Sequence, residues 1–114
     1  MADKILRWYF SGQVRPLTRV DGIHTLEADY RPEKVVMNFG DSPDGNAPTV
    51  IDIKDDGVSI FADDKAASTQ ASKTWTTMPG NTMYEDSIIS MDVYSVGQEF
   101  PGSDLTVELY LNAV

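Results

Sequence analysis

The chain has 114 residues, of which 41% are hydrophobic, and its net charge is −9. This length and composition predict a single domain over residues 1–114 with a sizeable core, and they exclude wholesale disorder. Because the sequence contains no cysteine, disulfides, thiolate metal sites and thiol redox chemistry are excluded. The first residues lack the pattern of a signal peptide, and no apolar run approaches the roughly 18 residues of a membrane span.

The first half of the chain predicts strands. Residues 5–10, 23–28 and 35–39 form apolar or alternating runs, and each run is bounded by turn residues. Residues 51–54 and 58–61 alternate around Asp55, Asp56 and Gly57. Asp-Gly between alternating runs favours a type I′ turn, which needs positive φ at both central positions. The sequence therefore predicts a hairpin at about residues 49–62.

The second half contains further strands and one loop. Residues 63–72 have no apolar face, so we predict a loop that holds at most one helical turn. Residues 73–78 are rich in strand-forming residues and are followed by Pro79 and Gly80. Alternation with period two predicts strands over 89–93 and 105–111. About eight short strands with regular turn signals predict an antiparallel β-sandwich or a small barrel.

Side chains that carry catalytic or metal chemistry are few. His24 is the one histidine, and no nucleophile motif accompanies it, so we expect no enzyme and no catalytic residue. The densest carboxylate cluster consists of Asp52, Asp55, Asp56, Asp63 and Asp64. These aspartates lack the spacing of a calcium-binding loop, so no metal site is predicted. Glycine motifs that bind phosphate are absent, and we expect no cofactor.

The aromatic side chains have two possible uses. Rings of Trp75, Tyr84 and Tyr94 on one concave patch would favour carbohydrate binding, whereas scattered rings would favour assembly. Tyr94 and Tyr110 fall on the polar, outward sides of their predicted strands. Because exposed aromatic residues often mark interfaces, a protein interface is the preferred interpretation.

Two segments resemble a known group of proteins. Residues 47–61 read Ala-Pro-Thr-Val-Ile-Asp-Ile-Lys-Asp-Asp-Gly-Val-Ser-Ile-Phe, and residues 96–111 read Val-Gly-Gln-Glu-Phe-Pro-Gly-Ser-Asp-Leu-Thr-Val-Glu-Leu-Tyr-Leu. They resemble small β-sandwich structural proteins of tailed bacteriophages, which share this hairpin and this closing strand. The resemblance covers residues 35–114. It implies a jelly-roll-like, non-enzymatic virion component that is assembled in the host cytoplasm.

Of the functions that this resemblance implies, we prefer a capsid decoration (cement) protein that stabilises the head shell. The expected partner is the major capsid protein or another virion protein, and the expected homo-oligomer is a trimer. Residues 1–10 would form an arm that adds a strand to a partner's exposed edge. Two alternatives stay open. The first is a tail, neck or fibre component that binds a receptor or carbohydrate, and the second is an enzyme or regulatory domain built on His24 and a carboxylate.

The distribution of charge suggests which side chains face a partner. Residues 1–34 hold six basic and five acidic side chains, whereas residues 35–114 hold three basic and thirteen acidic ones. The acidic body repels phosphate backbones, so nucleic-acid binding is not expected. The asymmetry is either a solvated surface without a partner or a sign that the N-terminal third faces an acidic partner. On the second interpretation, the partner-binding residues are Lys4, Arg7, Trp8, Phe10, Arg15, Arg19, Tyr94 and Tyr110.

Overall fold

The computed structural model describes residues 2–45, 47–61, 64–97 and 99–114. These residues form β1 (Lys4–Gln13), β2 (Ile23–Thr25), β3 (Tyr30–Asp41), β4 (Thr49–Asp55), β5 (Val58–Ser59), β6 (Ala67–Ser68), β7 (Ser72–Trp75), β8 (Ile88–Ser95) and β9 (Ser103–Ala113). No helix occurs within these ranges, so none there could cross a membrane. The all-β prediction is confirmed.

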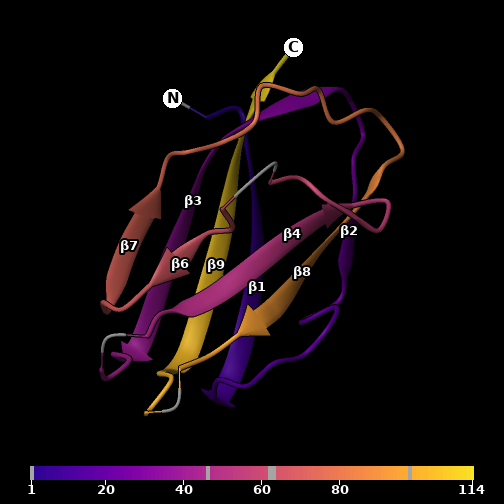
Figure 1. Cartoon of the computed structure of the whole chain (residues 1–114). Helices are drawn as coiled ribbons and strands as arrows, with labels where there is room; N and C mark the ends of the chain where they lie inside the picture. The colour runs from indigo at the N-terminus through magenta and orange to yellow at the C-terminus, as the bar shows by residue number, and fades with distance from the viewer. Residues whose placement is uncertain (1, 46, 62–63, 98) are drawn as a thin grey trace.

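The strands form two antiparallel sheets that pack face to face (Figure 1). One sheet has the order β1-β9-β3-β7, and we call it the β1 sheet. The other has the order β2-β8-β4-β5, with β6 also paired to β4, and we call it the β2 sheet. The prediction of a sandwich is therefore confirmed over the alternative of a barrel.

The order of the strands is that of a jelly roll. Strand β1 pairs with β9, β2 with β8, β3 with β7, and β4 with β5 and β6, so each pair encloses the next along the chain. This nested order arises when one long antiparallel ribbon is folded over into two facing sheets, which is the jelly-roll arrangement. The jelly-roll-like prediction is confirmed.

The core lies between the two sheets and follows the alternation of the sequence. Every second residue of the long strands is buried, as in the run Leu105, Val107, Leu109 and Leu111, each of which has no exposed surface. Burial of a side chain of this size contributes roughly 1.5–3 kcal/mol. Apolar alternation alone therefore accounts for the inner faces of β4, β8 and β9.

The predicted hairpin is present. Strands β4 and β5 pair through Lys54 with Ser59 and Asp55 with Val58. The turn residues Asp56 and Gly57 have φ of 50° and 85°, the two positive values that a type I′ turn requires. The last residue of the predicted range, Ala62, lies outside the described residues.

Some strand boundaries differ from the prediction. Strand β6 and the first residue of β7 lie within residues 63–72, which we predicted as a loop. Strand β6 makes two pairs with β4, through Thr49 with Ser68 and Val50 with Ala67, and two pairs are too short to produce a periodic signal. Strand β3 extends beyond the predicted residues 35–39 at both ends. The prediction missed its start because Pro32 there is a turn signal, and the register with β9 shifts between Pro32 and Lys34.

The N-terminal segment does not form a separate arm. Strand β1 pairs with β9 without interruption from Lys4 with Leu111 to Phe10 with Leu105. The side chains of Leu6, Trp8 and Phe10 are buried in the core. Residues 4–10 are thus an integral strand of the sandwich, and their inner face cannot leave it without opening the core.

Candidate protein–protein interface

The eight residues predicted to bind a partner do not share one surface. Trp8 and Phe10, predicted as apolar anchors, have exposed fractions of 0% and 4% and belong to the core. This corrects the prediction, and the reason is the face on which they lie. In β1 the even-numbered residues point inward, which the run of three aromatic residues at 8–10 conceals in the sequence.

Lys4 is neutralised within the chain. Its Nζ atom lies 2.6 Å from Oε2 of Glu27 and 6.0 Å from the ring centroid of Tyr30. The Tyr30 hydroxyl also donates a hydrogen bond to Glu27. The bond from Lys4, followed by that from Tyr30, lowers the pKa of Glu27 to about 2. Lys4 therefore stabilises the end of β1, and its charge is already paired.

Arg15 and Arg19 lie in the connection between β1 and β2. The guanidinium carbon of Arg15 lies 5.4 Å from the ring centroid of Phe10, within the range of a cation–π interaction. Arg19 has a φ of 52°, and its backbone N–H donates to Oδ1 of Asp92 at 2.9 Å. Both residues are exposed, and Arg15 contacts β1 through Phe10, whose side chain is on the opposite side of that strand from Arg7.

Arg7 and Tyr110 meet on the outer face of the β1 sheet. Arg7 is the register partner of Glu108, and its Nε atom lies 2.8 Å from Oε2 of Glu108. The hydroxyl of Tyr110 donates to the other oxygen of Glu108 at 3.5 Å. The Nζ atom of Lys34 lies 4.7 Å from the ring centroid of Tyr110. Glu108 thus joins β1 to β9 and orders the side chains around it.

Ile5 and Tyr9 complete this surface. They flank Arg7 on the outer side of β1, and 44% and 46% of their surfaces are exposed. The Tyr9 hydroxyl donates to Oδ1 of Asp104 at 3.1 Å, and this bond raises the pKa of Tyr9. We call this surface the outer β1-sheet face and define it by Ile5, Arg7, Tyr9, Lys34, Val36, Asp104, Thr106, Glu108 and Tyr110. The sequence prediction missed Ile5 and Tyr9, although alternation with the buried Leu6 places both on the outside.

The outer β1-sheet face is electrically balanced. Its defining residues include two basic side chains, Arg7 and Lys34, and two acidic ones, Asp104 and Glu108. Arg31, farther along β3 opposite Asn112, adds a third basic side chain beside it. A third acidic side chain, Glu33 in the irregular part of β3, accepts a hydrogen bond from Asn112 at 3.3 Å. The excess of nine negative charges therefore lies elsewhere on the molecule. Tyrosine and arginine are among the residue types that are enriched at protein interfaces, which makes this face the candidate.

The outer face of the β2 sheet differs from that of the β1 sheet because it contains two nearly buried carboxylates. Asp52 and Asp92 are register partners on neighbouring strands, and only 3% and 6% of their surfaces are exposed. Lys54 Nζ lies 2.9 Å from Asp92 Oδ2, which raises the pKa of Lys54, and the Ser59 hydroxyl donates to Asp52 at 2.6 Å. Because their carboxylates already have partners, these aspartates have a structural role.

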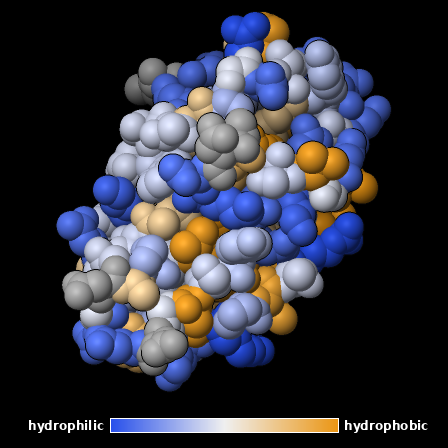
Figure 2. Space-filling view, in the orientation of Figure 1, coloured by the Kyte–Doolittle hydropathy of each residue, from blue (hydrophilic) through white to orange (hydrophobic). Residues whose placement is uncertain are grey.

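Tyr94 is exposed on the same sheet, as predicted from its outward position. It has 60% of its surface accessible, and Lys65 Nζ lies 4.5 Å from its ring centroid. On the face seen in Figure 2, apolar side chains form small spots separated by polar ones. The described residues on that face therefore form no broad apolar patch.

The free edge of β1 is covered by side chains. The N–H of Tyr9 donates to Oδ2 of Asp21 at 3.0 Å, and His24 Nε2 lies 3.1 Å from the carbonyl oxygen of Arg7. This contact requires the His24 Nε2–H to be the donor, because a carbonyl oxygen can only accept. The His24 ring also contacts Trp8 edge-on, with centroids 5.1 Å apart. Among the described residues, the hydrogen bond of His24 goes to a backbone oxygen and not to a carboxylate.

The aromatic residues considered for carbohydrate binding lie in different places. Trp75 is half-buried and pairs with Val35, on the inner side of β7. Tyr84 lies in the connection between β7 and β8 with 63% of its surface exposed, and Tyr94 lies near the far end of β8. A pocket beside the β4–β5 hairpin and another beside Phe10 and Arg15 include none of the three among their described lining residues. The three rings are therefore scattered over different elements and do not form one patch.

A metal site is not formed by the part of the chain that the structure describes. No three histidine, aspartate or glutamate side chains lie close enough there to hold an ion. Of the aspartate cluster, Asp52 is buried against Ser59, Asp56 accepts a hydrogen bond from the N–H of Ile88, and Asp63 lies outside the described residues.

Comparison with known proteins identifies no relative: no family model matches this sequence, and no curated protein or solved structure matches the chain. The fold assignment consequently rests on the strand pairing described above.

Proposed function

We propose that this protein is a non-enzymatic structural component of a tailed-phage virion, in which it decorates the capsid and stabilises the head shell. The jelly roll supports this proposal, because viral capsid domains commonly use that architecture. The motifs at residues 47–61 and 96–111 support it by their resemblance to phage sandwich proteins. The protein acts in the virion after assembly in the host cytoplasm.

The observation that carries the proposal is the outer β1-sheet face. In a protein with a net charge of −9, an acidic partner is repelled by most of the surface. The balanced face around Arg7 and Glu108 is free of that repulsion, and it exposes Ile5 and Tyr9 for burial. The face therefore meets the major capsid protein or another virion protein.

The protein acts as a homo-oligomer, for which we favour a trimer. Several copies of one modest contact, held together, bind a multivalent shell far more tightly than a single copy does. Ligands that bind only the assembled state stabilise it by mass action, so decoration strengthens the shell without any chemical step.

The test is cosedimentation of the purified protein with expanded, undecorated shells, together with light scattering for the mass of the free protein. We expect saturable binding at a fixed ratio to shell subunits. Tyr9→Ser should weaken binding by about tenfold, because truncation of an aromatic contact at the centre of an interface costs more than about 1.4 kcal/mol. Arg7→Glu should weaken it further by placing like charges around Glu108.

Tyr84→Ser is the matched control, since Tyr84 is an exposed tyrosine that lies outside the outer β1-sheet face. It should bind shells like the unaltered protein. Shell binding that survives both Tyr9→Ser and Arg7→Glu would contradict the proposed face, and a well-folded oligomer that binds no shell would contradict the decoration role.

A second candidate is a tail, neck or fibre component that binds a receptor or carbohydrate. Lectins also use the jelly roll, and Tyr94 beside Lys65 is the exposed aromatic side chain that such a role would employ. A glycan screen separates the candidates: saturable glycan binding that Tyr94→Ser abolishes, without any shell binding, would favour the second.

A further inference from the structure

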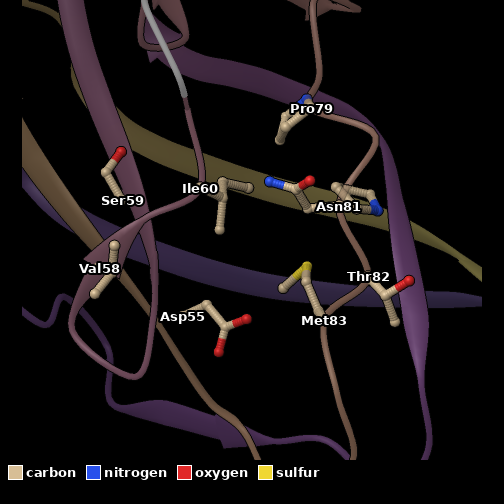
Figure 3. A pocket seen from close by; sticks show the side chains of 9 residues that line it. Asp55, Val58, Ser59, Ile60, Pro79, Asn81, Thr82 and Met83 are labelled. Atoms are coloured by element: carbon tan, nitrogen blue, oxygen red, sulfur yellow. The ribbon is translucent and has the colours of Figure 1, made fainter.

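A pocket of about 230 Å³ lies between the β4–β5 hairpin and the connection from β7 to β8 (Figure 3). Ligands of drug size occupy roughly 300–1,000 Å³, so this pocket fits a group about the size of one side chain. It lies apart from the outer β1-sheet face, and the inference drawn from it does not depend on the proposed function.

Slightly more than half of the pocket wall is apolar. Five apolar residues line it: Pro32, Val58, Ile60, Pro79 and Met83. Met83 is buried in the core, whereas Val58 has 70% of its surface exposed. Figure 3 shows Ile60 reaching in from the hairpin and Pro79 and Met83 reaching in from the opposite connection. An exposed valine beside such a wall offers contact area that a bound apolar chain would bury.

The charge in the pocket is a single carboxylate. Asp55 is the charged side chain among the described residues that line the pocket, and no ion pair between described residues includes it. Burial raises the pKa of Asp55, since a partly desolvated carboxylate is less stable when ionised. The remaining polar wall consists of Ser59, Asn81 and Thr82. The Ser59 hydroxyl is already engaged, because it donates to Asp52 and accepts from the N–H of Phe61. The Asn81 amide, which Figure 3 shows turned toward Ile60, carries an oxygen that can accept a hydrogen bond.

We propose that this pocket binds a primary alkylammonium group on a short apolar chain, with Asp55 as its counter-ion. An ammonium group has three N–H donors, which can donate to the Asp55 carboxylate and to the amide oxygen of Asn81. The apolar chain lies against Ile60 and Met83. An anion would be repelled by Asp55, and a sugar would find no aromatic ring among the described lining residues.

The test is a titration of ¹⁵N-labelled protein with n-butylammonium chloride at constant ionic strength, followed by amide chemical shifts. We expect saturable shifts confined to Val58, Ile60, Asn81 and Met83, with a Kd on the order of 1–10 mM for so small a ligand. n-Butanol, which lacks the charge, should produce much smaller shifts at equal concentration. Shifts that do not saturate, or that spread over the acidic surface, would overturn the proposal.

Two substitutions separate the pocket from general attraction to an acidic protein. Asp55→Asn keeps the size of the side chain and removes the counter-ion, and it should weaken binding by about tenfold or more. Asp56→Asn removes the same charge from the adjacent residue, which does not line the pocket and whose φ of 50° suits asparagine. It should change the Kd by less than about twofold. Equal losses in both variants would refute Asp55 as the counter-ion.

The source of the amine is decided by comparison with a peptide. A capped Gly-Lys-Gly peptide that binds more tightly than n-butylammonium would identify a lysine side chain of a partner protein as the ligand. A peptide that binds more weakly would identify a free amine. Whichever ligand binds more tightly, its binding to the Asp55→Asn variant must be lost for the proposal to stand.

Discussion

Glu27 shows how single residues hold the end of β1. Its carboxylate accepts hydrogen bonds from Lys4 and Tyr30, which lower its pKa from 4.5 to about 2. Because the folded pKa is lowered, the stabilisation is fully present above the pKa of the unfolded chain. It is lost as pH falls through about 2. Glu27 therefore supports the fold at neutral pH and through mild acid.

We expect an NMR pH titration of the Glu27 side-chain carboxyl to give a pKa near 2. Lys4→Met removes the larger of the two causes and should raise this pKa toward its ordinary value. Asp44→Asn, at an exposed acidic residue beyond the opposite end of β3, serves as the control and should leave it in place. An ordinary pKa for Glu27 in the unaltered protein would contradict the assigned contacts.

Gly57 is the residue on which the hairpin turn depends. With φ of 85°, any replacement with a Cβ enters the left-handed region, which costs roughly 1–2 kcal/mol. We expect Gly57→Ala to lower the free energy of unfolding by about 1 kcal/mol in urea denaturation. Gly80→Ala is the matched control, because Gly80 has an ordinary φ and open space at its Cβ position. Equal effects of both changes would show that the turn is not of the expected type.

At the scale of elements, the protection of β1 has a testable consequence. Asp21 and His24 occupy hydrogen-bonding groups on the free edge of this strand, where an unpaired edge would otherwise accept a strand from another chain. Asp21→Gly suits the positive φ at this residue, so it removes the side chain without backbone strain. Combined with His24→Ala, it uncovers the edge.

We expect this double variant to form dimers or larger species in a concentration-dependent way, measured by light scattering. Hydrogen exchange should show new protection at the amides of Arg7 and Tyr9 in the associated species. If the variant keeps the original oligomeric state at high concentration, the Asp21 and His24 side chains are not what prevents strand pairing at the edge of β1.

The elements differ in how far the sequence predicts them. Strands β8 and β9 follow from alternation, and the β4–β5 hairpin follows from its Asp-Gly turn. Strand β6 does not, because its two pairs leave no periodic pattern. The facing pair Asp52 and Asp92 also escapes prediction, since their contact depends on the register between strands that are distant in sequence.

The sequence predicted only part of the candidate interface, because the rest depends on contacts between residues that are distant in sequence. Arg7 and Tyr110 were selected by charge and by alternation, and both lie on the outer β1-sheet face. Trp8 and Phe10 were assigned to the wrong side because three consecutive aromatic residues hide the alternation of β1. The pairing of Lys4 with Glu27, which removes Lys4 from the free charges, requires the tertiary fold.

At the scale of the whole molecule, the separation of charge predicts how salt affects assembly. If the balanced outer β1-sheet face makes the contact, few net charges are brought together when the partner binds. We therefore expect the Kd for shells to change by less than about threefold between low and high salt. Cosedimentation across a salt series measures this. A steep loss of affinity would instead indicate contact through basic side chains such as Arg15 and Arg19, which form no ion pair with another described residue.

The nested order of the strands also governs when the fold can form. Lys4 pairs with Leu111, and both ends of the chain lie at the same end of the sandwich (Figure 1). Strand β9 separates β1 from β3, so the β1 sheet cannot close until residues 103–113 have left the ribosome. Contacts this distant in sequence make folding slow, on the scale of milliseconds to seconds. During synthesis the aromatic inner face of β1 stays exposed until β9 is available to pair with it. Because exposed apolar surface promotes aggregation, the nascent chain is most prone to aggregate during this interval.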